Sequence, residues 1–319
     1  MRVGSLCTGY GGLEMGLTAA FGEIDLRFIS DIDKNAAKLL AHHHPHIPNL
    51  GDLTTVNWEQ QDQIDVLTAG YPCQPFSYAG KRKIDDERAI FSYISDAVSV
   101  LRPRYLFFEN VAGHLTLGGV GVIAELTRLR YDCRWSIISA AQAGSAHQRK
   151  RLFIWCETSD IAFSDGRNQK PQSMAKTVRS ATEPRKPDSE ITTHAGSERY
   201  GGGENAGTMA DSTKQMEGET QQQRTRRQPE YRSSEAFDWR QYETAIRRWE
   251  TITGRSAPNP EIDNSVNPVF VEWMMGLPEG HVTDLGLSRS AQLKMLGNGV
   301  VPQQARLALE ILTEGGVYA

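Results

Sequence analysis

The sequence predicts an α/β fold with a mostly parallel sheet and helices on both of its faces. Over the first 156 residues, short apolar stretches alternate with amphipathic ones. Such alternation of strands and helices is typical of parallel sheets covered by helices. The first apolar stretch also leads directly into a glycine-rich turn, which is where doubly wound folds bind nucleotide-like ligands.

The expected elements follow from the apolar spacing, taken in chain order. Six strands are predicted, over residues 2–6, 26–30, 64–68, 105–108, 134–139 and 152–155. Helices between them are predicted over residues 34–44, 89–101 and 120–129. Later helices are predicted over 238–250 and 269–275, and the turn 297–302 is expected to start a last helix over 303–312. Proline suits the first turn of that last helix.

The composition is that of an ordinary water-soluble protein. The chain has 319 residues, 39% of them hydrophobic, and a formal net charge of −4. No apolar run approaches the roughly 20 residues that a membrane helix needs. The early glycine-rich turn leaves no room for a signal peptide, so a cytoplasmic location is expected. The net charge neither indicates nor excludes a nucleic-acid partner.

The four cysteines are far apart and show no CxxC spacing. This pattern argues against a zinc site and against a disulfide framework, and it favours a reducing compartment. A special cysteine in such a chain is expected to be a nucleophile.

Residues 157–260 lack the strand–helix rhythm and are rich in Ser, Thr, Gln, Gly and Arg. The composition by itself favours a long, partly disordered insertion. The organisation predicted is therefore a first domain over 1–156, an insertion over 157–266, and a C-terminal segment over 267–319.

Acidic and glycine residues mark the candidate ligand site. The turn after the first strand contains Gly9, Gly11 and Gly12, which would let the backbone approach a ligand at a helix N-terminus. Asp31 follows the second strand and could accept hydrogen bonds from ribose hydroxyls, and Asp52 could accept one from an adenine amino group. Each aspartate alone fits a helix cap, but together with the turn they predict an adenosine-shaped site.

The segment around Cys73 carries the clearest chemical signal. Cys73 follows an apolar strand and lies between Pro72 and Pro75, which restrict the loop. A buried structural cysteine is the alternative for an isolated residue. A Pro-Cys-Gln-Pro loop at the carboxyl end of a strand instead favours a nucleophile.

Two further positions suit acid–base and anchoring roles. Glu109 follows the apolar strand 105–108, where partial desolvation would raise its pKa. Such a carboxyl can donate a proton near neutral pH, although a helix cap is the alternative. Arg149 and Arg151 enter a strand with one residue between them, so they are expected to point the same way and grip one carbonyl, carboxylate or phosphate.

In their order along the chain, these motifs resemble those of the DNA (cytosine-5) methyltransferases, especially the small bacterial and phage-borne enzymes. They are the glycine-rich turn, Pro-Cys-Gln at 72–74, Glu-Asn-Val at 109–111, Arg-x-Arg at 149–151 and Gly-Asn-Gly-Val-Val at 297–301. The stretch 272–278 resembles the family's segment after its variable region. The resemblance covers roughly residues 2–156 and 267–312. It implies a Rossmann-like S-adenosylmethionine-dependent methyltransferase domain, with 157–266 as a smaller, loop-rich target recognition domain.

The resemblance also implies a mechanism. Cys73 would attack C6 of a cytosine that is flipped out of duplex DNA, and the methyl group of S-adenosyl-L-methionine would pass to C5. Glu109 would hold or protonate the ring at N3, while Arg149 and Arg151 would orient the base, the sugar-phosphate or Glu109. The residues implied to contact DNA or support its loop are Gln74, Ser77, Lys81, Arg82 and Asn110.

The cofactor contacts implied by the resemblance come from several segments. Their residues are Tyr10, Gly11, Gly12, Leu13, Asp31, Ile32, Asp52, Leu53, Gly70, Pro72, Asn298, Gly299 and Val300. Asp31 stands where the family usually has Glu, and Ile32 replaces a frequent aromatic residue. No metal is expected. The resemblance further implies a monomer that acts on double-stranded DNA, with S-adenosyl-L-homocysteine as product, in a restriction-modification or prophage context. A separate cognate endonuclease would fit that context.

Three alternatives stay open at this stage. One keeps the chemistry but methylates RNA, as in the transfer-RNA branch of the same fold family. Another is a DNA-binding protein that has lost catalysis, against which Cys73, Glu109, Arg149 and Arg151 argue together. The third is a nicotinamide-dependent dehydrogenase, for which the glycine spacing does not fit.

Overall fold

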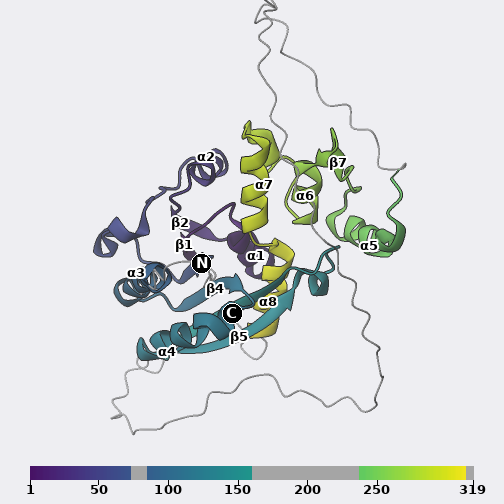
Figure 1. Cartoon of the computed structure of the whole chain (residues 1–319). Helices are drawn as coiled ribbons and strands as arrows, with labels where there is room; N and C mark the ends of the chain where they lie inside the picture. The colour runs from purple at the N-terminus through teal and green to yellow at the C-terminus, as the bar shows by residue number, and fades with distance from the viewer. Residues whose placement is uncertain (73–84, 160–236, 314–319) are drawn as a thin grey trace, which may run out of the picture. The chain divides into compact units, whose positions relative to one another are not determined.

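The computed structural model describes residues 1–72, 85–159 and 237–313 (Figure 1). The residues predicted at Cys73, Gln74, Ser77, Lys81 and Arg82 lie outside this part of the chain. The insertion between 160 and 236, with the disorder expected there, also lies outside it.

A six-stranded sheet forms the centre of the described fold. Its strands are β1 (Arg2–Leu6), β2 (Asp25–Ser30), β3 (Val66–Ala69), β4 (Tyr105–Val111), β5 (Tyr131–Ser139) and β6 (Lys150–Thr158). They are arranged in the order β2-β1-β3-β4-β6-β5. The pairs β1–β2, β1–β3 and β3–β4 are parallel, whereas β6 runs antiparallel to β4 and β5. The predicted mostly parallel sheet is confirmed, and each predicted strand overlaps an observed one.

The helices of the described residues follow the predicted order. They are α1 (Gly12–Phe21), α2 (Lys34–His43), α3 (Asp85–Leu101), α4 (Val120–Arg128), α5 (Glu243–Thr253), α6 (Pro268–Met274), α7 (Arg289–Asn298) and α8 (Pro302–Thr313). Short 3-10 turns occur at Leu53–Thr55, Trp58–Gln60, Ala140–Ala143, Arg240–Tyr242 and Thr283–Leu285, with a π-helical turn at Leu115–Gly119. As predicted, Pro302 opens the last helix.

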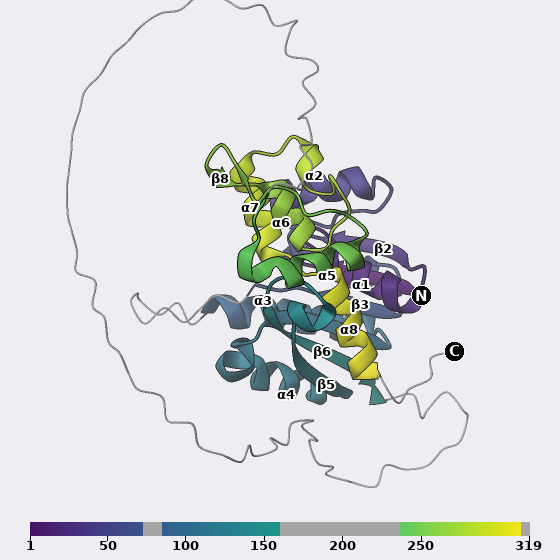
Figure 2. The same ribbon diagram turned by 90° about the vertical axis from the view of Figure 1, so that its right-hand side faces the viewer.

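The sheet separates two apolar layers, because successive side chains of a strand point to opposite faces. On β4, Phe107 packs in the layer formed with α1, α2 and α8, while Phe108 packs in the layer formed with α3 and α4. On β6, Phe153 and Ile154 divide in the same way. Figure 1 shows the strands between α3 on one side and α1 and α8 on the other, and Figure 2 looks onto the face that α1 and α8 cover. Helices on both faces are therefore confirmed.

The residues after 237 add a helical group to the first of these layers. Trp249 on α5 and Trp273 on α6 are buried in that layer, and the Trp249 indole donates to the Trp273 carbonyl at 2.9 Å. A short hairpin, β7 (Glu261–Ile262) with β8 (Ser265–Val266), lies between the two helices in the chain. The domain boundaries at 156/157 and 266/267 stay predictions.

Two local expectations were wrong. The turn predicted over 297–302 is shorter, because helix α7 continues through Gly297 to Asn298. Helix α7 was not predicted, since its polar sequence lacks a clear apolar stripe; the Ser288 side chain caps it by accepting from the Ala291 amide. Strand β4 also runs past residue 108 to Val111, so Glu109 lies inside the strand, opposite Phe153 on β6.

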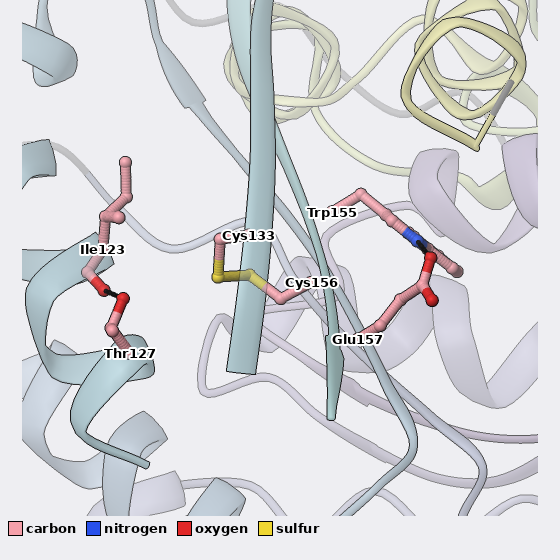
Figure 3. The surroundings of a disulfide bond; sticks show 6 residues. All are labelled: Ile123, Thr127, Cys133, Trp155, Cys156 and Glu157. Atoms are coloured by element: carbon pink, nitrogen blue, oxygen red, sulfur yellow. Dashed lines mark hydrogen bonds between the residues drawn. A yellow bond between two sulfur atoms is a disulfide. The ribbon is translucent and has the colours of Figure 1, made fainter. Parts of the chain in front are cut away.

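The argument against a disulfide was wrong as well. Cys133 on β5 faces Cys156 on β6 in the ladder, with Cα atoms 4.0 Å apart, and their sulfur atoms are bonded (Figure 3). Spacing along the chain could not show this, because strand register alone brings the two residues together. By the loop-closure argument, a bridge over 23 residues stabilises the fold by about 3 kcal/mol.

Within the described residues, Cys7 is the free cysteine, and no cluster of His, Cys, Asp or Glu could hold a metal ion. None of the described helices is both long and apolar enough to cross a membrane.

Candidate active site

A cavity of about 620 Å³ opens at the carboxyl ends of the parallel strands β1, β2, β3 and β4. This edge of a parallel α/β sheet is where such folds bind ligands. The C-terminal turn around Gly299 and helix α7 complete the wall.

Most of the predicted site residues within the described part of the chain line this one cavity. They are Tyr10, Gly12, Leu13, Asp31, Ile32, Asp52, Leu53, Gly70, Pro72, Glu109, Asn110, Arg151, Asn298, Gly299 and Val300. Gly11 and Arg149 do not line it. The predicted residues are thus brought together from segments almost 300 residues apart in the sequence.

The glycine-rich turn meets the C-terminal turn directly. The Tyr10 hydroxyl donates to the Val300 carbonyl at 2.8 Å. A Cβ atom on Gly12 would lie 2.3 Å from that same carbonyl oxygen, and one on Gly299 would lie 1.8 Å from the Tyr10 ring. Non-bonded heavy atoms do not approach each other this closely, so the two turns can meet in this way only with glycine at both positions.

Asp31 turns its carboxylate toward the glycine-rich turn. One carboxylate oxygen accepts the Gly9 amide at 2.7 Å, and the other accepts the Asp33 amide at 2.9 Å. Burial raises the pKa of Asp31, which these hydrogen bonds partly oppose. Ile32, the next residue, is 72% exposed at the rim of the cavity and is free to cover a flat ligand.

Asp52 is engaged in local structure. Its side chain caps the 3-10 turn Leu53–Thr55, accepting from the Thr54 amide at 3.0 Å and the Thr54 hydroxyl at 2.7 Å. The helix-cap interpretation that the sequence left open is therefore observed for Asp52. Leu53 is buried in the layer formed with α3 and α4 while also lining the cavity.

Glu109 and Arg151 form a buried ion pair in the wall of the same cavity. The Arg151 Nε lies 2.8 Å from Glu109 Oε1, and the two side chains are 16% and 8% exposed. Burial raises the pKa of Glu109 to about 7, although Arg151 and Arg149 oppose the rise. At neutral pH the carboxyl therefore populates both protonation states and can give or take a proton.

Arg149 has a different partner from Arg151. Its guanidinium donates to the Gly297 carbonyl at 2.8 Å and to the Gly299 carbonyl. The expectation that both arginines grip one group was wrong. Arg149 precedes β6, and its φ of 23° lies outside the strand region, so strand alternation does not apply to it.

Asn110 holds the backbone at Tyr71, which lies two residues before Cys73 in the chain. Its side-chain amide donates to the Tyr71 carbonyl at 3.2 Å, and its side-chain oxygen accepts the Val111 amide at 2.8 Å. Tyr71 and Pro72 are the last described residues before Cys73, and both line the cavity.

Glu14, Lys294 and Cys7 are among the lining residues that the sequence did not predict. Glu14 is 5% exposed on α1, accepts from the Thr68 hydroxyl, and has an Oε2 atom without a partner. An acid beside the apolar pair Leu13 and Leu17 was the available signal. Lys294, 3.2 Å from Asp33, escaped notice because helix α7 was not predicted. Cys7 also lines the cavity, where burial and then Asp31 raise its pKa to about 12, which disfavours the thiolate form.

This sheet order, with its cavity at the strand ends, defines a Rossmann-like methyltransferase fold. Across the whole chain, the structure resembles the Dnmt2 methyltransferase of S. pombe with a TM-score of 0.59, covering 100% of both chains at 16% identity. At that identity the likeness shows the fold alone.

Residues 1–313 match the family model for C-5 cytosine-specific DNA methylases, and the chain belongs to that family. The type II methyltransferase M.NlaX of Neisseria lactamica is 30% identical over 159 residues, which is 48% of this chain and 51% of the relative. M.HhaI of Haemophilus parahaemolyticus is 28% identical over 197 residues, 60% of this chain and 58% of the relative. The orphan methyltransferase M.Rho11sI of Bacillus phage rho11s is 32% identical over 174 residues, which is 52% of this chain and 34% of the relative. The matches thus span between 34% and 58% of these relatives.

Proposed function

We propose that this protein is a DNA (cytosine-5-)-methyltransferase. It would take S-adenosyl-L-methionine as methyl donor and a cytosine flipped out of double-stranded DNA as acceptor. The observation that carries the proposal is the buried Glu109–Arg151 pair, which opens onto the same cavity as the glycine-rich turn in a chain of this family.

The residues present fit the methyl donor. Gly12 and Gly299 let the glycine-rich turn and the C-terminal turn pack directly against each other, and both residues line the cavity at the strand ends, where an adenosyl group can lie. Asp31 and the exposed Ile32 suit a ribose and an adenine ring, and the unpartnered Glu14 Oε2 supplies a polar contact at the turn. When bound, S-adenosyl-L-methionine supplies an electrophilic methyl group and leaves as S-adenosyl-L-homocysteine. No metal ion is required.

Cys73 would begin the reaction. Its thiolate forms a bond to C6 of the cytosine, and the displaced ring electrons make C5 nucleophilic toward the methyl group. After methylation a base removes the C5 proton, the C5–C6 double bond re-forms, and the thiolate leaves. Cys73 is therefore unchanged at the end of each turnover.

Glu109 would balance the charge during this attack. In its protonated form it donates a proton to N3 as electrons move into the ring, and it takes the proton back when the thiolate leaves. A pKa of about 7 suits both directions at neutral pH. Arg151 holds the carboxyl in place, whereas Arg149 acts on the C-terminal turn through the Gly297 and Gly299 carbonyls.

The remaining assignments follow the family. Residues 157–266 would be the target recognition domain, and Gln74, Ser77, Lys81 and Arg82 would contact DNA as the nucleophile loop closes. Asn110 would support that loop through Tyr71. The protein would act as a cytoplasmic monomer in a restriction-modification or prophage context, with any cognate endonuclease acting separately.

Base-resolution bisulfite sequencing tests the proposal. DNA would be taken from a methylation-free host that expresses either the wild type or Cys73→Ala. The expected result is a set of protected cytosines within one short motif in the wild type, and none in the variant. Full conversion in both samples, with soluble protein present, contradicts the proposed substrate, and methyl incorporation into transfer RNA would then be measured.

A further inference from the structure

His281 lies behind the glycine-rich turn, outside the cavity lining. Its Nε2 atom is 2.9 Å from the carbonyl oxygen of Tyr10, and the two rings meet edge to face with centroids 6.3 Å apart. The imidazole is only 7% exposed. The segment of the protein that follows α6 therefore reaches the backbone of the first turn of the fold.

The hydrogen bond to Tyr10 fixes the tautomer of His281. A carbonyl oxygen can only accept, so Nε2 must carry the proton and donate it. Burial lowers the pKa of His281 to about 4, and His42, His43 and His44 act in the same direction. The ring thus stays neutral at physiological pH, and the contact with Tyr10 is a hydrogen bond between neutral groups.

Glu272 holds the backbone on which His281 stands. Its carboxylate accepts the amides of Gly280 at 2.9 Å, Val282 at 2.6 Å and Thr283 at 3.0 Å, and the Thr283 hydroxyl at 2.9 Å. Glu272 is 1% exposed. Four bonds to one buried carboxylate fix the short segment on both sides of His281.

His43, on helix α2, holds the ring from the other side. The two imidazoles are stacked with centroids 4.0 Å apart and planes 11° apart, and His43 Nε2 donates to the His281 carbonyl at 2.8 Å. His281 is therefore clamped between α2 and the turn.

The turn itself needs such a clamp. Gly9 and Gly11, on either side of Tyr10, have φ values of 59° and 84°. Glycine reaches this left-handed region without strain but also has many other conformations available. Tyr10 lines the cavity and joins it to Val300, so any movement at Tyr10 is passed to both turns.

We propose that His281 is a positioning residue for the methyl-donor pocket, which holds the glycine-rich turn in its binding conformation through the Tyr10 carbonyl. This inference rests on the proposed function, because it presumes that the cavity binds the donor. It links donor binding to the segment after α6, which no motif of the pocket includes.

Calorimetric titration with S-adenosyl-L-homocysteine provides the test. The His281→Phe variant keeps the ring and its stacking but loses the donor, so its affinity is expected to fall about tenfold, the size of one buried hydrogen bond. The His281→Gln variant places an amide N–H near the Nε2 position, and its affinity is expected to stay within about threefold of the wild type. The matched control, His46→Phe, changes an exposed histidine of the same region and is expected to bind as the wild type does.

Melting temperatures and the KM for DNA separate positioning from plain stability. A loss of affinity in His281→Phe, measured well below its melting temperature and with the KM for DNA unchanged, supports the inference. Wild-type affinity in His281→Phe overturns it, as does an equal loss in His281→Gln and His281→Phe. Should His281→Phe not fold, His43→Phe decides, with binding weaker by more than about threefold expected and unchanged binding overturning the inference. If the wild type itself does not bind S-adenosyl-L-homocysteine, the proposed function fails. If the wild type binds it and His281→Phe binds it equally well, only the inference about His281 fails.

Discussion

Two parts of the cavity wall, which the proposed function makes a donor end and a catalytic end, are built by different means. At the donor end, the walls are backbone and glycine: Gly12 and Gly299 allow two turns to touch, and Tyr10 joins them through a carbonyl. At the catalytic end, the wall is a buried ion pair between Glu109 and Arg151. The first end depends on close steric fit, whereas the second depends on electrostatics.

This difference indicates which kind of change each end tolerates. A buried carboxylate is costly unless it is paired, and the cost appears as a raised pKa, which is the property that proton transfer needs. The glycine contacts at the donor end carry no such electrostatic cost, but they leave no space for even one additional carbon atom. Changes of charge should therefore have their largest effect at the catalytic end, and changes of volume at the donor end.

Removing the charge at the catalytic end should give the largest effect. In Glu109→Gln the side chain can no longer donate a proton to N3, so kcat is expected to fall about 10²- to 10⁴-fold. Single-turnover methyl transfer to duplex DNA measures this, with affinity for S-adenosyl-L-homocysteine unchanged. Glu310→Gln, which changes an exposed glutamate of α8, is the control. If Glu109→Gln lost affinity for S-adenosyl-L-homocysteine as well as kcat, the two ends would not act independently.

Adding one methyl group at the donor end should come next. Gly12→Ala would place a Cβ 2.3 Å from the Val300 carbonyl oxygen and force the turns apart. Overpacking of this kind costs about 1–3 kcal/mol, so the affinity for S-adenosyl-L-homocysteine should fall about 10- to 100-fold. Gly121→Ala on α4 is the matched control, because its Cβ would meet nothing within 4 Å. Equal affinity of the two variants would disprove the steric account.

The buried carboxyl should also make stability depend on pH. The pKa of Glu109 rises from 4.5 to about 7 on folding, so the folded state binds the proton more tightly than the unfolded state. Its stabilising contribution is complete below pH 4.5 and is lost as the pH rises through 7. Relative to Glu109→Gln, the unfolding free energy of the wild type should fall by about 2.5 kcal/mol between pH 5 and pH 8. Urea denaturation of both proteins at several pH values checks this, and parallel curves would contradict it.

Asp31 should show the smallest effect. Asparagine in its place keeps one acceptor oxygen, so the hydrogen bond to the Gly9 amide or to the Asp33 amide is lost. The expected loss of affinity for S-adenosyl-L-homocysteine in Asp31→Asn is about tenfold. Asp62→Asn, at an exposed position, serves as the comparison. Wild-type binding by Asp31→Asn would mean that the turn keeps its binding conformation without one of these two hydrogen bonds.

Local patterns were sufficient where a residue's role depends on its own strand or turn. The alternation of apolar stretches predicted every strand of the sheet, because burial on two faces selects continuous runs of apolar residues. The predicted ends of the strands then placed Asp31 and Glu109 at the same edge of the sheet. Helix α7 and the residue Lys294 were missed, since a polar helix that borders a cavity carries no clear apolar stripe.

By itself, the sequence determined the fold class, the order of the strands along the chain, the family motifs and the edge of the sheet at which they meet. Only the tertiary structure decided that Arg149 binds the C-terminal turn, that Cys133 faces Cys156, and that His281 supports Tyr10. Each of these pairs is separated by at least 23 residues in the sequence. Their contacts depend on strand register and on the packing of distant segments, which local periodicity does not specify.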